Sequence, residues 1–154
     1  MEKTVVLGKG IGSINFGSSK DDILAKLGPA DEIEKISFEE EGGGVAEVWH
    51  YDDEELSFSF EEEYDWMLTS IACSSPETSF EGSFVVDMEK GDLLAFLTKN
   101  GFQDVVNEDI SEEDTDEELI SSDEKSINFW MQDGLLREVQ FGPFIDEEGE
   151  YQFD

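Results

Sequence analysis

Several features common in secreted and membrane proteins are missing from this sequence. It has one cysteine, Cys73, among 154 residues, so no disulfide can form within the chain. The opening segment has no apolar stretch long enough for a signal peptide, and no lipidation cysteine follows it. No run of about 18 apolar residues occurs, so no membrane-spanning helix is predicted. We therefore expect a cytoplasmic protein that does not contact membranes.

Basic residues are also scarce, and this imbalance dominates the composition. Lysine and arginine number 9 against 41 aspartates and glutamates, which gives a formal net charge of −32 and a pI near 4.1. The hydrophobic fraction of 38% and the 12 phenylalanines are enough for a folded core, so the charge does not indicate disorder. The negative field repels nucleic acids and anionic membranes and attracts cationic proteins. The composition therefore predicts a basic protein partner and argues against nucleic acid.

The sequence lacks the residue sets that most enzyme classes require. His50 is the only histidine, and it lies inside a predicted strand, close to Asp52 and Asp53. No nucleophile motif such as Gly-x-Ser-x-Gly accompanies it, so we interpret it as an ordinary strand residue. Cys73 falls on the predicted inner face of a strand, where a thiol is usually inert. We expect no catalytic residue and no enzymatic activity.

Metal and phosphate sites are not predicted either, despite the many carboxylates. The acidic stretches 52–55, 109–118 and 146–148 lack the glycine and the ligand spacing of a calcium loop. The sequence has too few thiol and imidazole groups for a zinc site. The glycine-rich segment 8–12 lacks the Gly-Lys-Ser/Thr ending and the following helix of a phosphate-binding loop. We expect no metal and no cofactor, apart from weak, nonspecific Ca²⁺ association.

The first half of the chain predicts an extended segment, a helix and three strands. Residues 11–17 are extended, and the serines that follow, with carboxylates three residues later, are typical of a helix N-terminus. The helix is expected to end at Gly28 and Pro29. The strands are predicted at residues 46–51, 56–60 and 68–73.

The second half predicts the same order of elements. Residues 83–86 are extended, and Asp87 is expected to cap a helix that ends at Asn100 and Gly101. A weak strand is predicted at residues 118–121. Two stronger strands, at 126–131 and 135–141, are joined by the turn signal Gln132-Asp133-Gly134.

The two halves align with each other at an offset of about 70 residues, which indicates an internal repeat. Three segments carry the alignment: 22–27 with 92–97, 56–60 with 127–131, and 68–71 with 136–139. We therefore predict an α+β fold of two tandem strand–helix–three-strand repeats. The first repeat is expected at 1–78 and the second at 79–154, together forming one compact unit.

Alternation of apolar and polar residues assigns the two faces of the predicted antiparallel sheet. The apolar set should lie beneath the helices, and the opposite face should be mostly small or polar and therefore wet. The predicted inner residues are Leu56, Phe58, Phe60, Ile71, Cys73, Ile127, Phe129, Met131, Val139 and Phe141. The predicted outer residues are Ser57, Ser59, Ser70, Asn128, Trp130, Glu138 and Gln140.

This layout resembles a known repeat. A short strand ending in Phe16-Gly17, a helix closed by Leu27-Gly28-Pro29 and a three-stranded meander are similar to the unit of the β-lactamase inhibitor protein-like fold, and to the single unit of the SmpA/BamE lipoproteins. The resemblance covers roughly residues 11–145. It implies one joined sheet with helices on one face and an open concave face that grips a protein. Small bacterial immunity proteins are among the chains with this layout. The disulfides, signal peptide and lipid-bearing cysteine of those relatives are absent, so their targets do not carry over.

Aromatic residues near acidic ones are the candidate contact points with a partner. Exposed tryptophan and tyrosine rimmed by carboxylates are typical of protein-binding hot spots. The alternative is that these aromatic side chains complete the core. The candidate partner-binding residues are Trp49, Tyr51, Asp52, Asp53, Trp66, Asn128 and Trp130.

Two functional hypotheses follow from the sequence. In the first, the chain is a non-enzymatic binding or inhibitory protein, such as an immunity protein that neutralises a cationic toxin, for example a nuclease. In the second, it is a structural or assembly module whose acidity serves solubility or adaptation to high salt.

Overall fold

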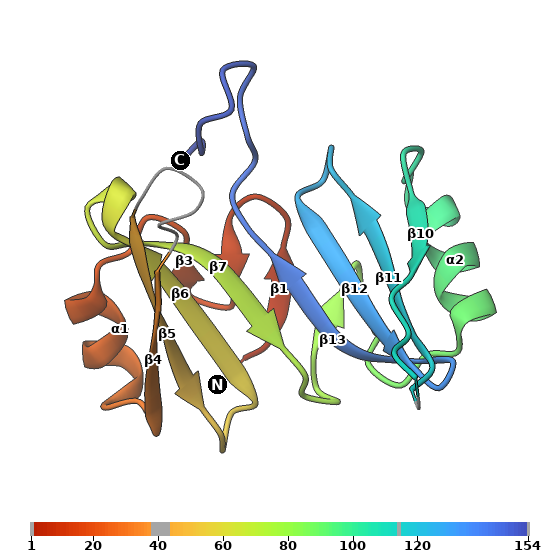
Figure 1. Cartoon of the computed structure of the whole chain (residues 1–154), viewed down its shortest axis with the longest axis horizontal. Helices are drawn as coiled ribbons and strands as arrows, with labels where there is room; N and C mark the ends of the chain where they lie inside the picture. The colour runs from red at the N-terminus through yellow and green to blue at the C-terminus, as the bar shows by residue number, and fades with distance from the viewer. Residues whose placement is uncertain (1, 38–43, 114, 154) are drawn as a thin grey trace.

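The computed structural model describes residues 2–37, 44–113 and 115–153, which form an α+β fold made mostly of strands. These ranges contain two sheets and two α-helices. The larger sheet has eight strands and the smaller has five. Figure 1 looks onto the larger sheet, with one helix near each of its outer edges.

The eight-stranded sheet has a mirrored strand order. The second half of the chain supplies one side, the first half supplies the other, and all neighbouring strands are antiparallel. The two sides meet where β13 pairs with β7 through only three residue pairs, a contact that we call the seam. From edge to edge the strands are β10 (Val106–Asp109), β11 (Glu117–Ser122), β12 (Ile127–Gln132), β13 (Leu135–Phe141), β7 (Met67–Cys73), β6 (Leu56–Glu61), β5 (Val45–Tyr51) and β4 (Glu32–Ser37).

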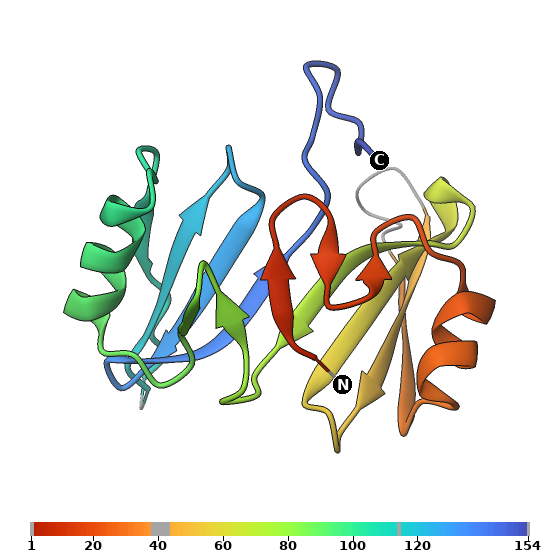
Figure 2. The same ribbon diagram turned by 180° about the vertical axis from the view of Figure 1, so that it is seen from behind.

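The five-stranded sheet also joins the two halves of the chain, because β1 pairs in parallel with β8. Figure 2 shows this sheet and both helices on the same side of the large sheet, which we call the covered side. The opposite surface of the large sheet is called the open face. In order, the small strands are β3 (Ile14–Asn15), β2 (Gly10–Ile11), β1 (Thr4–Val6), β8 (Ser79–Phe80) and β9 (Ser83–Phe84).

Helix α1 (Lys20–Leu27) begins and ends as predicted. The Ser19 hydroxyl accepts a 3.1 Å hydrogen bond from the backbone N–H of Asp22, whose carboxylate accepts one of 3.1 Å from the Ser19 N–H. This reciprocal pair satisfies two donors that the first helical turn leaves without partners. At the other end, Gly28 lies at φ 77° and its N–H donates to the Leu24 carbonyl.

The predicted cap of helix α2 (Lys90–Lys99) at Asp87 is wrong. The N-cap residue is Glu89, whose side chain makes no capping bond. Asp87 lies at φ 75°, and its carboxylate instead accepts a 2.6 Å hydrogen bond from the guanidinium of Arg137. The helix starts later than expected because the Asp87 N–H donates to the Leu136 carbonyl at 2.7 Å, which holds this segment against β13.

The predicted inner face of the large sheet is confirmed. All ten residues assigned to it are at most 3% exposed. They pack against the buried side chains of the helices, Ile23 from α1 and Leu93 and Leu97 from α2. The core therefore lies between the large sheet and the layer formed by the helices and the small sheet.

Each half of the large sheet has one strand more than the sequence predicts. The additional strands are the outermost ones, β4 and β10, and almost all their side chains are exposed. Strands of this kind bury no apolar face, so they lack the alternation that identified their neighbours. A short 3-10 helix, η2 (Glu62–Tyr64), follows β6.

Each half also contains a β-bulge at a corresponding place. In the first half, Ser59 pairs with Ser70 and the next pair is Phe60 with Leu68, so Thr69 has no opposite residue. In the second half, the register shifts in the same way around Arg137. A bulge leaves one residue unpaired and redirects its side chain. Thr69 and Arg137 are therefore special positions that strand periodicity alone does not reveal.

Candidate protein-binding face

The centre of the open face is made of mostly small or polar side chains, one from each strand, which lie in a row across the sheet. Strand alternation places these side chains on the surface opposite the buried core residues. The central row, which follows the register from β10 to β4, consists of Val106, Ser121, Asn128, Gln140, Ala72, Ser57, His50 and Glu32. Small side chains in the middle of this row leave the backbone of the sheet accessible to a flat partner surface.

Charge is distributed very unevenly between the two sides of the large sheet. By register, the open face carries the carboxylates of Glu32, Glu34, Glu108 and Glu138. All eight lysines instead lie on elements of the covered side: the helices, the small sheet, the β11–β12 turn and the inward side of β4. The open face is therefore a surface of negative potential within a negatively charged protein.

Contacts of the lysine side chains confirm their placement. Lys20 of α1 bonds the Glu47 carboxylate at 3.1 Å, and Lys90 of α2 bonds Glu118 at 2.6 Å. Lys125 lies above the ring of the core residue Phe102, 5.8 Å from its centroid. Lys20 and Lys90 therefore neutralise carboxylates beneath the helices, and within the described part of the chain the ion pairs of lysine involve no carboxylate of the open face.

Trp49 and Tyr51 do not lie on the open face, which corrects their predicted exposure. They are 7% and 5% exposed and belong to the core. The Tyr51 hydroxyl donates a 2.9 Å hydrogen bond to the Gly28 carbonyl at the end of α1, and the Trp49 ring packs on Phe60. Both residues share a face of their strand, as expected, but it is the face that the helix covers.

Trp66 also lies away from the open face. Its half-buried ring packs against the core, and the Lys20 ammonium of α1 lies 3.8 Å from the ring centroid. Asp52 and Asp53 are exposed in the turn between β5 and β6. Asp52 lines a hollow of about 270 Å³ that opens between this turn and Glu138. Of these three predicted residues, the two aspartates are exposed and Trp66 is partly exposed at a place away from the open face.

Asn128 and Trp130 lie on the open face, where the sequence placed them. Both are partly exposed and alternate with buried residues of β12. Trp130 pairs across the sheet with Leu119 on one side and Glu138 on the other. The ring therefore belongs to a small apolar patch that is bordered by a carboxylate.

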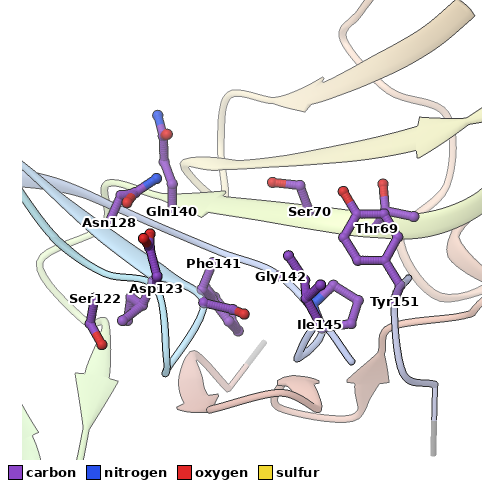
Figure 3. A pocket seen from close by; sticks show the side chains of 13 residues that line it. Thr69, Ser70, Ser122, Asp123, Asn128, Gln140, Phe141, Gly142, Ile145 and Tyr151 are labelled. Carbon is purple, nitrogen blue, oxygen red and sulfur yellow. The ribbon is translucent and has the colours of Figure 1, made fainter. Parts of the chain in front are cut away.

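A hollow at one end of this face was not anticipated from the sequence. It has a volume of about 300 Å³ and lies between the seam, the β11–β12 turn and the C-terminal segment 143–153. Figure 3 shows Asp123, Asn128 and Gln140 on one side of it and Thr69 and Tyr151 on the other. We call it the seam pocket. Its key residue, Thr69, stands at a bulge and therefore gave no signal in the alternation pattern.

Thr69 and Ser126, two residues that line the seam pocket, have hydroxyl oxygens that are closed off from solvent. Thr69 is 2% exposed, and within the described residues neither its Oγ1 nor the Oγ of Ser126 has a hydrogen-bond partner. Leaving a buried hydroxyl unsatisfied costs about 1–3 kcal/mol. Such groups are rare in folded proteins and call for a specific explanation.

The C-terminal segment is held over this end of the sheet by an aromatic cluster. The ring of Tyr64 lies 4.7 Å from that of Tyr151, and its hydroxyl donates a 2.8 Å hydrogen bond to Glu150. This hydrogen bond raises the pKa of Tyr64 to about 12. Burial, together with the nearby Glu61 carboxylate, raises the pKa of Tyr151.

The groups considered for catalysis occupy ordinary structural positions. His50 lies on the open face, with Nδ1 2.7 Å from the Ser57 hydroxyl and Nε2 3.3 Å from Glu34. Cys73 is fully buried beside Thr78, and burial raises the pKa of its thiol. Within residues 2–37, 44–113 and 115–153, no three acidic, histidine or cysteine side chains are grouped as metal ligands. The helices in these ranges are too short or too polar to cross a bilayer.

Comparisons with known proteins place the chain in no family. No protein-family model and no curated protein matches its sequence. It is similar in structure to an extracellular protein containing a SCP domain from Bacillus anthracis strain Ames, with 15% sequence identity and a TM-score of 0.48. The similarity covers 90% of this chain and 50% of that protein, so the chain spans about half the length of its structural neighbour.

Proposed function

We propose that this protein is a non-enzymatic binding protein whose open face contacts a basic protein. The single observation that carries the proposal is the absence of lysine from that face, all eight lysines lying on the covered side. A partner with clustered lysine and arginine would meet complementary potential there. Complementary charge speeds encounter and disfavours wrong partners. An immunity protein that neutralises a cationic toxin such as a nuclease fits this description.

The proposal includes an architecture of two joined copies of one unit, similar to the β-lactamase inhibitor protein-like fold. The mirrored strand order and the bulges at Thr69 and Arg137 support it. Corresponding backbone hydrogen bonds beside the two bulges also support this architecture. Leu68 accepts from the Gly17 N–H at 2.9 Å, and Leu136 accepts from the Asp87 N–H at 2.7 Å. A sheet made from two such units offers a wide face for one partner.

A pair of matched double variants tests the face. The immobilised protein captures basic proteins from a lysate of its host, and each captured protein is then purified and titrated by calorimetry. Ser59→Arg with Ala72→Arg places two cations on the open face. The control, Ala25→Arg with Ala95→Arg, adds the same charge to exposed positions of the two helices. We expect the open-face variant to weaken binding at least about a hundredfold and the control to weaken it only a few fold.

Two outcomes would contradict this proposal. Equal loss of affinity in both double variants would mean that net charge, and not the open face, determines binding. Association that is not saturable and disappears entirely at high salt would favour the alternative of an assembly or solubility role. If a captured nuclease is inhibited at a one-to-one ratio by the native chain and by the helix variant, the immunity role is established.

A further inference from the structure

The covered side of the large sheet contains a cation held jointly by a tryptophan and a carboxylate. The ammonium group of Lys20 lies 3.8 Å from the centroid of the Trp66 ring and 3.1 Å from a carboxylate oxygen of Glu47. The face of an indole ring attracts a cation, and a neighbouring carboxylate supplies the opposite charge. Tryptophan and glutamate therefore act together as a cation-binding pair in this fold.

The open face carries the same pair without a cation. Trp130 of β12 lies directly opposite Glu138 of β13, and side chains paired in this way have Cβ atoms about 4.5–5.5 Å apart. Both residues are partly exposed, whereas their neighbours Phe129, Met131 and Val139 are buried. The indole ring and the carboxylate therefore lie side by side on the accessible surface of the sheet.

Neither group is satisfied by the described part of the chain. With the described residues, the Trp130 side chain makes no ring contact, no cation contact and no hydrogen bond. The Glu138 carboxylate accepts a 2.8 Å hydrogen bond from the Gln140 amide and takes part in no ion pair among the same residues. The other two tryptophans differ, because the Trp49 N–H donates to Glu47 and the Trp66 ring holds Lys20.

The chemistry of the pair favours a guanidinium over an ammonium group. A guanidinium is planar, so it can stack on an indole ring and donate parallel hydrogen bonds to a carboxylate. It is also less strongly hydrated than an ammonium group, which favours it at a partly exposed position. Leu119, which pairs with Trp130 on its other side, supplies apolar surface for the methylene groups of the same side chain. Asp52 and Glu55, which line a hollow together with Glu138, add negative potential nearby.

We propose that Trp130 and Glu138 together bind an arginine side chain, with the guanidinium stacked on the indole ring and paired with the carboxylate. That this arginine belongs to the basic partner rests on the proposed function. The corresponding pair beside the first bulge is Ser59 with Ser70, which offers neither a ring nor a carboxylate. The tightest contact is therefore expected on the second half of the open face.

The first experiment compares tetra-arginine with tetra-lysine, both acetylated and amidated, so that length and charge are equal. Affinity is measured by calorimetry at constant ionic strength, and the indole N–H signal of Trp130 is followed by NMR. We expect the native chain to bind tetra-arginine about two- to fivefold more tightly than tetra-lysine, with the larger shift at Trp130. Equal affinities, or a preference for tetra-lysine, would overturn the proposal.

Two variants, each with a matched control, test the named groups. Trp130→Leu should abolish the preference for tetra-arginine, whereas Phe84→Leu, which removes a ring that is 69% exposed on the small sheet, should preserve it. Glu138→Gln should reduce the affinity for tetra-arginine several fold more than Glu81→Gln, in the turn between β8 and β9. Because both groups bind one guanidinium, the double variant should lose less than the product of the two single losses. Behaviour equal to that of the control in either Trp130→Leu or Glu138→Gln would refute the assignment.

The purified basic partner separates this inference from the proposed function. If both are correct, Trp130→Leu and Ser59→Arg/Ala72→Arg each weaken partner binding, and Phe84→Leu does not. Weakened binding in Ser59→Arg/Ala72→Arg, with equal partner affinities in Trp130→Leu and Phe84→Leu, would refute the arginine contact and leave the binding face. Intact partner affinity in Ser59→Arg/Ala72→Arg, together with the expected tetra-arginine results, would refute the binding face alone.

Discussion

The two bulges of the large sheet share one backbone geometry and have different surroundings. Thr69 is 2% exposed and lies under the C-terminal segment, where it lines the seam pocket. The side chain of Arg137 is 39% exposed and binds Asp87, which precedes helix α2. In both halves the bulge lies next to a residue, Leu68 or Leu136, whose carbonyl accepts a backbone hydrogen bond from the segment before the helix. What the redirected side chain does depends on the segment that covers it.

The largest expected effect tests whether the two halves contribute equally to stability. Phe58 and Phe129 occupy corresponding positions on β6 and β12, and both are fully buried. Truncation of either to alanine should lower the free energy of unfolding by about 3–5 kcal/mol, because a large cavity is created in the core. Chemical denaturation of Phe58→Ala and Phe129→Ala measures both values. A loss below 1 kcal/mol in one variant would show that its half is loosely packed.

The second effect concerns the close approach of β13 to the first bulge. A Cβ atom at Gly142 would lie 2.9 Å from the Thr69 carbonyl oxygen. Gly142→Ala should therefore destabilise the protein by roughly 1–3 kcal/mol through overpacking at the seam. Thermal melting measures the change, and Gly91→Ala, where a Cβ has open space in α2, is the control. Equal melting temperatures in the two variants would contradict the close approach.

The third prediction is that substitutions at the two bulges change the free energy of unfolding in opposite directions. Thr69→Val should raise the free energy of unfolding by about 1 kcal/mol, because a buried hydroxyl without a partner is replaced by a methyl group. Arg137→Gln removes a partly exposed ion pair and should lower it by about 0–1 kcal/mol. Urea denaturation of both variants provides the comparison. Destabilisation by Thr69→Val would mean that its hydroxyl is satisfied in the folded protein.

The smallest effect is a pH dependence at the contact between Tyr64 of the first half and Glu150 of the second. Because the folded-state pKa of Tyr64 is raised to about 12, its bond to Glu150 stabilises the fold below pH 10. This stability is lost as the pH rises from about 10 to 12. Melting temperatures across this range should fall less steeply in Tyr64→Phe than in the native chain. Parallel curves would contradict the role of the hydrogen bond.

Much of the fold could be predicted from the sequence, because the core strands alternate regularly and helix α1 has a well-defined cap. Phe58, Phe129 and Ser19 each behave as their local pattern indicates. Trp49 could not be placed in the same way, since a strand with apolar residues on both faces does not show which face the helix covers.

The candidate site was less predictable for a different reason. Asn128 and Trp130 follow from alternation, and the structure places both on the open face. The seam pocket depends on a one-residue bulge at Thr69 and on a ring, Tyr151, that comes from the far end of the chain. Neither a register shift nor a contact between distant segments leaves a periodic signal in the sequence.

The seam has a consequence for how the molecule holds together. Each half supplies one strand to the three-pair contact of β13 with β7 and one to the two-pair contact of β1 with β8. A fragment ending before β8 would expose unpaired edges in both sheets at once. The two fragments produced by a cut in the loop before β8 should therefore be unstable alone and should recover the native structure only when mixed. Such complementation would show that the contacts of β13 with β7 and of β1 with β8 are enough to bring the two halves together without a covalent link.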